Sequence, residues 1–243
     1  MSVKTAAKSS RAKSPDTSFV TGSLPKELLR FAGPFMLGVL VQNLYGAVDL
    51  LVVGHYATTA DVSAVTVGSQ LMNIVTQLVI GFATGITVLI GQSFGAGNKA
   101  RLGKTVGAAV LLFGGAAAIL TLVYLGGNSL FVSAMQTPAE AVAATKSYLF
   151  ACYFGIIFIT GYNIINSILT GLGDSRTPFL FVLIACVINI VLDIVLVRYF
   201  FMGALGAAIA TSVAQAGSFF FALAYLRRKG LGFPLGKANF HFN

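Results

Sequence analysis

Six long apolar segments alternate with short polar stretches along this chain. A helix needs about 20 residues to cross the hydrocarbon core of a bilayer, and each segment is at least that long. The pattern therefore predicts an all-α membrane protein, a bundle of six transmembrane helices within residues 24–229. The expected spans are 31–53, 63–91, 104–125, 143–170, 177–199 and 203–226.

The two ends of the chain lack apolar runs long enough to span. Residues 1–23 are rich in Ser, Lys and Ala, and we expect a disordered basic cytoplasmic tail there. Their acid-poor composition leaves an organelle transit peptide open. Residues 230–243 read as a polar cytoplasmic tail, and we expect that a longer reading frame is truncated there.

Composition places the chain in a bilayer. It is 56% hydrophobic and only 9% charged, whereas a soluble domain is about 25% charged. It has 27 Gly and no Trp, and small residues allow membrane helices to approach closely.

The basic residues give the orientation. Fourteen of the 16 Lys and Arg flank the spans on one side, and only Lys146 and Arg198 fall on the other. By the positive-inside rule both termini are cytoplasmic in a multi-pass protein of the plasma or inner membrane. Such confinement to short segments argues against a nucleic-acid partner, which requires a solvent-facing basic surface.

Cysteines and histidines offer no catalytic or metal-binding pattern. Cys152 and Cys186 lie in apolar segments and are expected to be buried free thiols, while His55 and His241 are isolated in a loop and a tail. There is no HExxH sequence and no histidine within a span to pair with a serine. We therefore expect a protein that is not an enzyme and that has no cofactor.

Two of the seven acidic residues, Asp49 and Asp193, fall inside predicted spans. A charge at mid-bilayer costs roughly 2.5–3.5 kcal/mol on insertion scales. No Lys or Arg lies within a span core, so each carboxylate must hold a proton, bind a metal cation or face water. Both are candidate functional residues, although Asp49, near the end of its span, could simply be hydrated.

Asn189 precedes Asp193 by one helical turn. An amide oxygen and a carboxylate at this spacing can supply two hard oxygen ligands, as small hydrated cations prefer. Alternatively, the amide donates a hydrogen bond to the carboxylate and tunes its proton affinity. The spacing does not distinguish these two roles.

Other polar residues repeat at steps of three or four, which places them on shared helix faces. Such faces should look toward other helices or a wet cavity. For the spans at 63–91 and 143–170, interhelical hydrogen bonding and cavity lining both remain open. The cavity-lining candidates are Gln42, Tyr45, Ser69, Asn73, Gln77, Asn163, Asn166 and Gln215. Pro34 removes one backbone hydrogen bond inside the first span and is a candidate hinge.

Several of these segments resemble the multidrug and toxic compound extrusion (MATE) family. The similarity covers residues 26–229 and corresponds to the N-terminal six-helix lobe of a twelve-helix transporter. It is carried by VLIGQSFGAGNKARLGK (88–104), NSILTGLGDSRTPF (166–179), NIVLDIVLV (189–197) and GALGAAIATSVAQ (203–215).

The resemblance implies a secondary antiporter that exports organic cations or amphipathic drugs or metabolites in exchange for Na+ or H+. Asp49 matches the acidic residue on the family's first helix. Asn189 and Asp193 match a pair on its fifth helix, and Thr211 matches a hydroxyl residue on its sixth. The resemblance thus implies a cation site formed by these four side chains.

The chain departs from the family in having one lobe instead of two. It is expected to be either a non-transporting fragment or a half-transporter that needs a second lobe, which a parallel homodimer could supply. A lipid-linked saccharide flippase is a weaker alternative. It would need basic residues inside the bundle to hold pyrophosphate, and the span cores have none.

Overall fold

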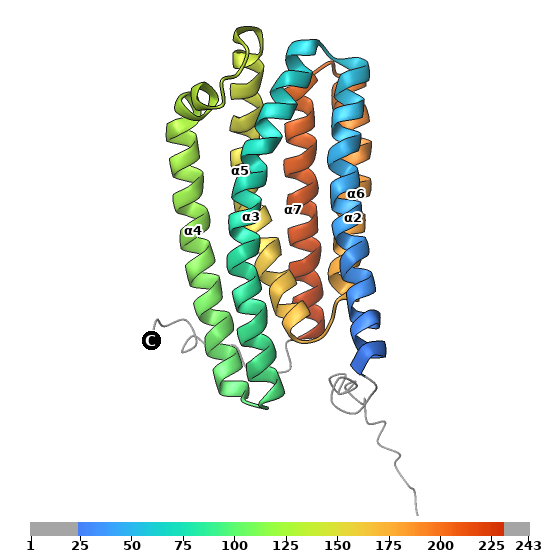
Figure 1. The fold of residues 1–243 in the computed structure, drawn as a ribbon, viewed down its shortest axis with the longest axis vertical. Helices are drawn as coiled ribbons and strands as arrows, with labels where there is room; N and C mark the ends of the chain where they lie inside the picture. The colour runs from blue at the N-terminus through green and yellow to red at the C-terminus, as the bar shows by residue number, and fades with distance from the viewer. Residues whose placement is uncertain (1–23, 231–243) are drawn as a thin grey trace, which may run out of the picture.

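A computed structural model describes residues 24–230, and this part of the chain is built from helices (Figure 1). The predicted tails, including His241, lie outside the described residues except for Gly230. Six helical segments are long and apolar enough to cross a membrane, which confirms the six-helix all-α fold. The elements are α2 (Leu24–Tyr56), α3 (Thr59–Gly95), α4 (Lys99–Ala134), a 3-10 turn η1 (Ala139–Ala141), α5 (Val142–Gly171), α6 (Arg176–Asp193), a π-helix η2 (Ile194–Tyr199) and α7 (Gly203–Lys229).

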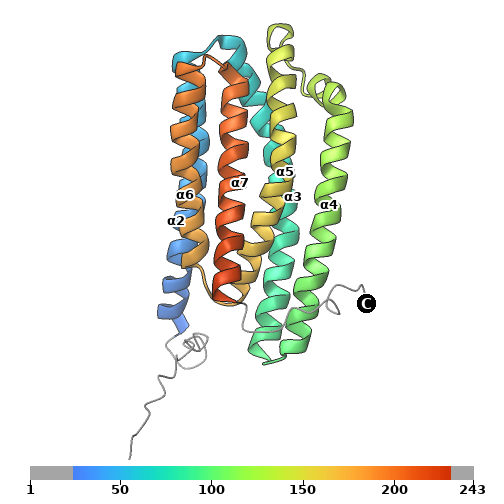
Figure 2. The ribbon, with the colours of Figure 1, turned by 180° about the vertical axis from the view of Figure 1, so that it is seen from behind.

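The helices pack side by side in a bundle with α5 at its centre. α5 contacts α3, α4 and α7, while α2 packs mainly against α6. Seen from opposite sides, α2 and α3 lie on one face of the bundle, and α6 and α7 on the other (Figures 1 and 2). The α2–α3 and α6–α7 connections share one end, which the Lys and Arg distribution predicts to be the outer end.

Helix α4 extends well beyond the span expected from the sequence. α4 runs from Lys99 to Ala134, although the apolar run suggested 104–125. Gly126, Gly127 and Asn128 interrupt the apolar pattern but not the helix, and the Asn128 amide donates to the Lys146 carbonyl of α5 at 3.1 Å. A helix of 36 residues exceeds the thickness of the hydrocarbon core, so its ends project beyond it.

Short turns join the helices, and their caps are visible in the sequence. The Asn98 side chain accepts from the Arg101 N–H at 2.9 Å and caps the start of α4. Gly97 before it has φ +66°, a conformation that glycine adopts without strain. Pro34 lies inside α2, which continues as one helix past it, so its role as a hinge stays a prediction.

Asp61 binds the starts of both α3 and α7, at the predicted outer end. Its carboxylate accepts from the Thr58 N–H and hydroxyl, at 3.1 and 2.7 Å, which caps α3. The other oxygen accepts from the Ala204 N–H of α7 at 2.9 Å. Gly203 has φ +53°, and a Cβ there would lie 2.5 Å from Asp61 Oδ1. The carboxylate therefore faces the positive ends of two helix dipoles, which stabilise it.

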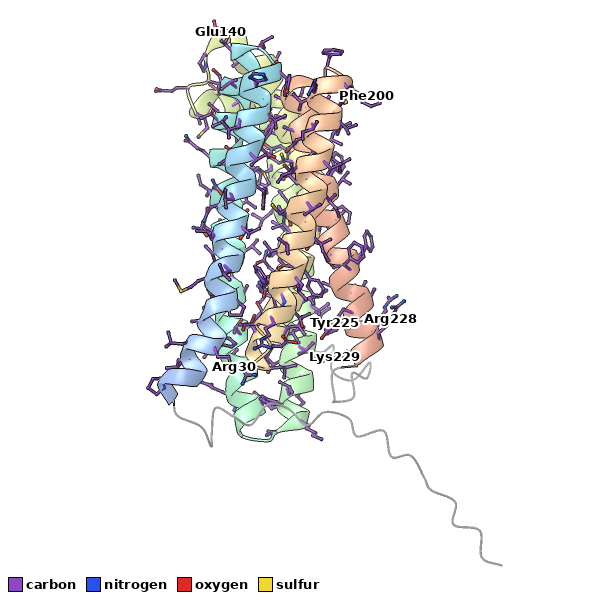
Figure 3. The ribbon with its side chains drawn as sticks, turned by 90° about the vertical axis from the view of Figure 1, so that its right-hand side faces the viewer. Arg30, Glu140, Phe200, Tyr225, Arg228 and Lys229 are labelled. Carbon is purple, nitrogen blue, oxygen red and sulfur yellow. The ribbon has the colours of Figure 1, made fainter. Side chains whose placement is uncertain are left out.

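Asp174 performs a similar task at the opposite end. It accepts from the Thr177 N–H at 3.1 Å and hydroxyl at 2.7 Å, and from Lys229 Nζ at 3.1 Å. The Thr177 hydroxyl also lies 3.2 Å from Tyr225 Oη, and Figure 3 shows Tyr225 and Lys229 together at this end. The α5–α6 turn is thereby fastened to the end of α7.

We expect Asp61→Ala to destabilise the bundle by roughly 1–3 kcal/mol, because it uncaps two helices and leaves the Ala204 N–H unpaired. The measurement is thermal unfolding in detergent, followed by circular dichroism. Glu140→Ala is the matched control, since Glu140 is an exposed acid at the same end (Figure 3). Equal unfolding temperatures for the two variants would contradict the double-cap assignment.

The Asp174 contacts predict a pH dependence of stability. Burial opposes ionisation, but the hydrogen bonds from Thr177 and the ion pair with Lys229 outweigh it and lower the pKa of Asp174. A lowered pKa means that the stabilisation is complete above the unfolded value of about 4 and is lost as pH falls through the folded pKa. Asp174→Asn should therefore lower the unfolding temperature at pH 7, and the difference should shrink below about pH 4. A difference in unfolding temperature between the parent chain and Asp174→Asn that stays constant down to pH 2 would contradict this role of the Asp174 carboxylate.

Candidate functional site

Helices α2, α6 and α7 bring four of the predicted site residues together. The Asn189 amide donates to Thr211 Oγ1 at 3.3 Å, and the Thr211 hydroxyl donates to Asp49 Oδ2 at 3.1 Å. The carboxyl groups of Asp49 and Asp193 are close enough to interact with each other. We call Asp49, Asn189, Asp193 and Thr211 the polar quartet.

Three members of the quartet are buried, whereas Thr211 is partly exposed. Asp193 is 0% exposed, Asn189 1% and Asp49 6%. Among the described residues, the ion pair that forms joins Lys229 to Asp174, and none involves Asp49 or Asp193. Burying an ionised carboxylate without a partner is strongly unfavourable, so the quartet requires a positive charge or a proton from outside the protein.

Four oxygen atoms of the quartet have no hydrogen-bond partner. They are Asp49 Oδ1, Asn189 Oδ1 and both carboxylate oxygens of Asp193. The large majority of buried side-chain polar atoms in native proteins are hydrogen-bonded, so four buried oxygens without a partner in one cluster make this the candidate site for a proton or a cation. With the Thr211 hydroxyl they form a set of hard oxygen donors, which suits a small cation such as Na+.

The types of donor group in the quartet indicate which class of ligand it could bind. Within the described residues, no group of three or more His, Cys, Asp or Glu side chains comes together to hold a metal ion. The quartet has two carboxylates, one amide and one hydroxyl. This donor set fits a monovalent cation or a proton better than a transition metal, which favours imidazole or thiolate ligands.

Local sequence explains how the quartet assembles. Asn189 and Asp193 share a face of α6 because they are one turn apart. On α7, Ala207, Ala208 and Ala210 are fully buried, and small residues let neighbouring helices approach closely. The close approach brings Thr211 within hydrogen-bonding distance of both α2 and α6.

A second polar layer lies one turn from the quartet. The Gln215 amide donates to Tyr45 Oη at 3.2 Å, and Gln42 is a side-chain neighbour of the same hydroxyl. Tyr45 precedes Asp49 by four residues, and Gln215 follows Thr211 by four. Three of the predicted lining residues therefore adjoin the quartet, on the side nearer the predicted cytoplasmic end.

The other lining candidates lie elsewhere. Ser69 on α3 donates to its own helix at the Thr66 carbonyl, and Asn163 on α5 donates to Ile159. Asn166 accepts from Thr170, also within α5. These side chains satisfy their hydrogen bonds within one helix and do not join the quartet.

Asn73 and Gln77 lie on the exposed surface of α3, away from the quartet. Both are exposed on α3, and neither forms a hydrogen bond with another described residue. The structure thus divides the predicted lining residues into those beside the quartet, those bonded within their own helix, and this exposed pair.

Sequence reasoning missed Tyr148 of α5, which is buried and close enough to both carboxylates to interact with them electrostatically. Its ring packs against Gly68 of α3, where a Cβ would overlap it. A tyrosine in an apolar run is typical of a helix core, so the sequence carried no signal for this position. Cys152 one turn further is a buried free thiol, whereas the free thiol of Cys186 is only partly buried.

The structure also has an apolar groove away from the quartet. It has a volume of about 490 Å³ and lies between α5 and α7, with Phe150, Phe154 and Ile209 among its lining residues. Its polar lining residue, Ser212, donates to the Ala151 carbonyl at 3.0 Å. The groove offers no cation ligands and is not part of the candidate site.

Known proteins share this architecture. The chain is 29% identical over 208 residues to "Probable multidrug resistance protein YpnP" of Bacillus subtilis (strain 168), covering 86% of this chain and 47% of the relative. It is also 29% identical over 194 residues to "Probable multidrug resistance protein NorM" of Thermotoga maritima, covering 78% and 42%. The chain spans about half the length of these relatives.

Solved structures show the same fold. A crystal structure of MATE in the bent conformation matches with a TM-score of 0.86 at 24% identity, covering 93% of this chain and 51% of that one. An outward-facing multidrug resistance MATE family transporter of the MOP superfamily matches with a TM-score of 0.86 at 24% identity, covering 93% and 50%. The match is to about half of each transporter, as expected for a single lobe.

The family model described as MatE matches residues 34–195, which contain most of the first five spans and three members of the polar quartet. The resemblance noted in the sequence is thereby confirmed, and the chain belongs to the MatE family.

Proposed function

We propose that this chain is a six-helix lobe of a cation-coupled antiporter, which exports organic cations or amphipathic compounds in exchange for Na+ or H+. The observation that supports this most is the set of four buried oxygens without partners, contributed by Asp49, Asn189 and Asp193. The names of the relatives as multidrug resistance proteins support the substrate class.

The two carboxyl groups explain why the lobe would take up one cation at a time. Asp49 and Asp193 are close neighbours, and two adjacent carboxylates repel each other when both are ionised. A single proton or Na+ removes this repulsion and satisfies several orphan oxygens together. A proton or Na+ bound at the two carboxyl groups then favours one arrangement of α2, α6 and α7. Cation uptake is coupled to export if the exported compound favours a different arrangement.

The exposed amides on α3 support a second lobe. Asn73 and Gln77 lie on a membrane-spanning helix, and lipid cannot satisfy amide hydrogen bonds. A water-filled cavity between two lobes can satisfy them. Because the chain covers about half of its relatives, the second lobe would come from a further part of the same protein or from another copy.

Asp193→Asn should abolish exchange of a fluorescent organic cation driven by a Na+ or pH gradient in proteoliposomes, because a neutral amide cannot take up the coupling charge. Insertion and thermal unfolding should be retained. Glu140→Gln is the matched control, since it neutralises an exposed carboxylate outside the quartet. If Asp193→Asn still exchanges the organic cation, Asp193 is not the residue that takes up the coupling charge.

A binding measurement separates the site from the need for a second lobe. If Na+ is the coupling ion, Na+ should raise the unfolding temperature of the parent chain more than K+ does, because ligand binding stabilises the folded state. Asp193→Asn should lose that selectivity. Selective binding without exchange by the isolated chain would show a lobe that requires its partner.

The exposed amides give a separate prediction about the cavity. In a chain whose Cys152 and Cys186 are replaced by Ala, we expect Asn73→Cys and Gln77→Cys to react with a water-soluble thiol reagent. Ile119→Cys is the control, because Ile119 is an exposed apolar residue of α4. Labelling of position 73 no faster than position 119 would place the α3 amides against lipid and contradict the cavity.

A further inference from the structure

Helices α2 and α6 contact each other at two levels. They run side by side in the same direction (Figures 1 and 2), with Asp49 and Asp193 at the deeper level. At the outer end, Arg198 Nη1 donates to Tyr56 Oη at 3.3 Å, and the guanidinium lies 5.1 Å from the centre of the Tyr56 ring. This distance is within the range of about 6 Å for a cation–π contact. We call the Arg198–Tyr56 contact the outer clamp.

A π-helical turn connects the two levels on α6. Asp193 is the last residue of α6, and η2 begins directly after it. Residues five apart on an α-helix point about 140° away from each other. The wider i→i+5 turn of a π-helix reduces this angle, so Arg198 can face α2 while Asp193 also faces it. π-turns are frequent at functional sites.

The far end of η2 is fixed as well. Phe201 has φ +55°, which is an uncommon and costly conformation for a bulky residue and persists only where the surroundings impose it. Gly203 follows with φ +53°, and the Ala204 N–H is bound by Asp61. The π-turn is therefore held between the start of α7 on one side and the outer clamp on the other.

The side chain of Asp193 is not fixed by hydrogen bonds to described residues. Neither of its carboxylate oxygens accepts a hydrogen bond from a described residue. Its position opposite Asp49 therefore depends on the backbone of α6 and η2 and on packing. Asp49 is held by Thr211, and it lies seven residues, roughly 10 Å along α2, from Tyr56.

We propose that Arg198 and Tyr56 are positioning residues, which hold the π-turn of α6 against α2 and so set how closely Asp193 approaches Asp49. The clamp acts through the backbone and touches neither carboxylate. Its use in cation exchange rests on the proposed function, but the positioning itself can be measured without transport.

The test is bridging of a cysteine pair by Hg2+. Asp49→Cys and Asp193→Cys are combined in the chain whose Cys152 and Cys186 are replaced by Ala, and the rate at which the two thiols are bridged reports their approach. Adding Arg198→Gln should slow bridging at least about threefold. Arg198→Lys and Tyr56→Phe each keep a cation over a ring, and both should remain near the parent rate.

Arg228→Gln is the matched control, because Arg228 is an exposed arginine at the opposite end (Figure 3). Equal bridging rates in Arg198→Gln and Arg228→Gln would overturn the proposal. If Arg198→Gln does not fold, Tyr56→Leu removes the clamp from the α2 side, and unchanged bridging there would overturn it equally.

Exchange assays on the chain with both aspartates intact distinguish this proposal from the proposed function. There, Arg198→Gln should raise the Na+ or H+ concentration needed for half-maximal exchange about threefold. Slower bridging together with no effect on exchange would uphold the positioning role and contradict its part in the cation cycle.

Discussion

A pair of buried carboxyl groups without a counter-charge is the constraint on which the rest of this structure depends. Asp49 and Asp193 are almost inaccessible and lie within a bundle built to sit in lipid, where an unpaired charge is least favourable. Helices α2, α6 and α7 surround them with neutral oxygen atoms instead of basic groups. A proton or a cation bound between these helices would balance the charge, as the proposed coupling role requires.

The same residue type serves two purposes in this chain, and hydrogen bonding distinguishes them. Asp61 and Asp174 each accept three hydrogen bonds and fasten the two ends of the bundle. Asp193, by contrast, accepts none. The hydrogen-bonded carboxylates fasten the connections between helices, whereas the carboxylate of Asp193 stays available for the proposed proton or cation. The outer clamp and the π-turn connect that site to the fixed outer end.

The surface of the bundle has an apolar part and a part that carries amide side chains. The lining of the groove between α5 and α7 is apolar, whereas α3 exposes Asn73 and Gln77, which form no hydrogen bond with another described residue. Lipid suits the first surface and not the second. The chain is also about half the length of its relatives, and in the proposed function the apolar side faces lipid and the amide-bearing side faces a second lobe.

The sequence by itself determined the six spans, because apolar runs of this length have only one favourable environment. It also determined that Asn189 and Asp193 share a face, because their spacing matches the helical repeat. Only the tertiary structure decided which polar stripes meet: Tyr45 pairs with Gln215, while Ser69 and Asn163 bond within their own helices. The π-turn after Asp193 and the clamp at Arg198 likewise depend on how α2, α6 and α7 pack, and periodicity within one helix carries no information about its neighbours.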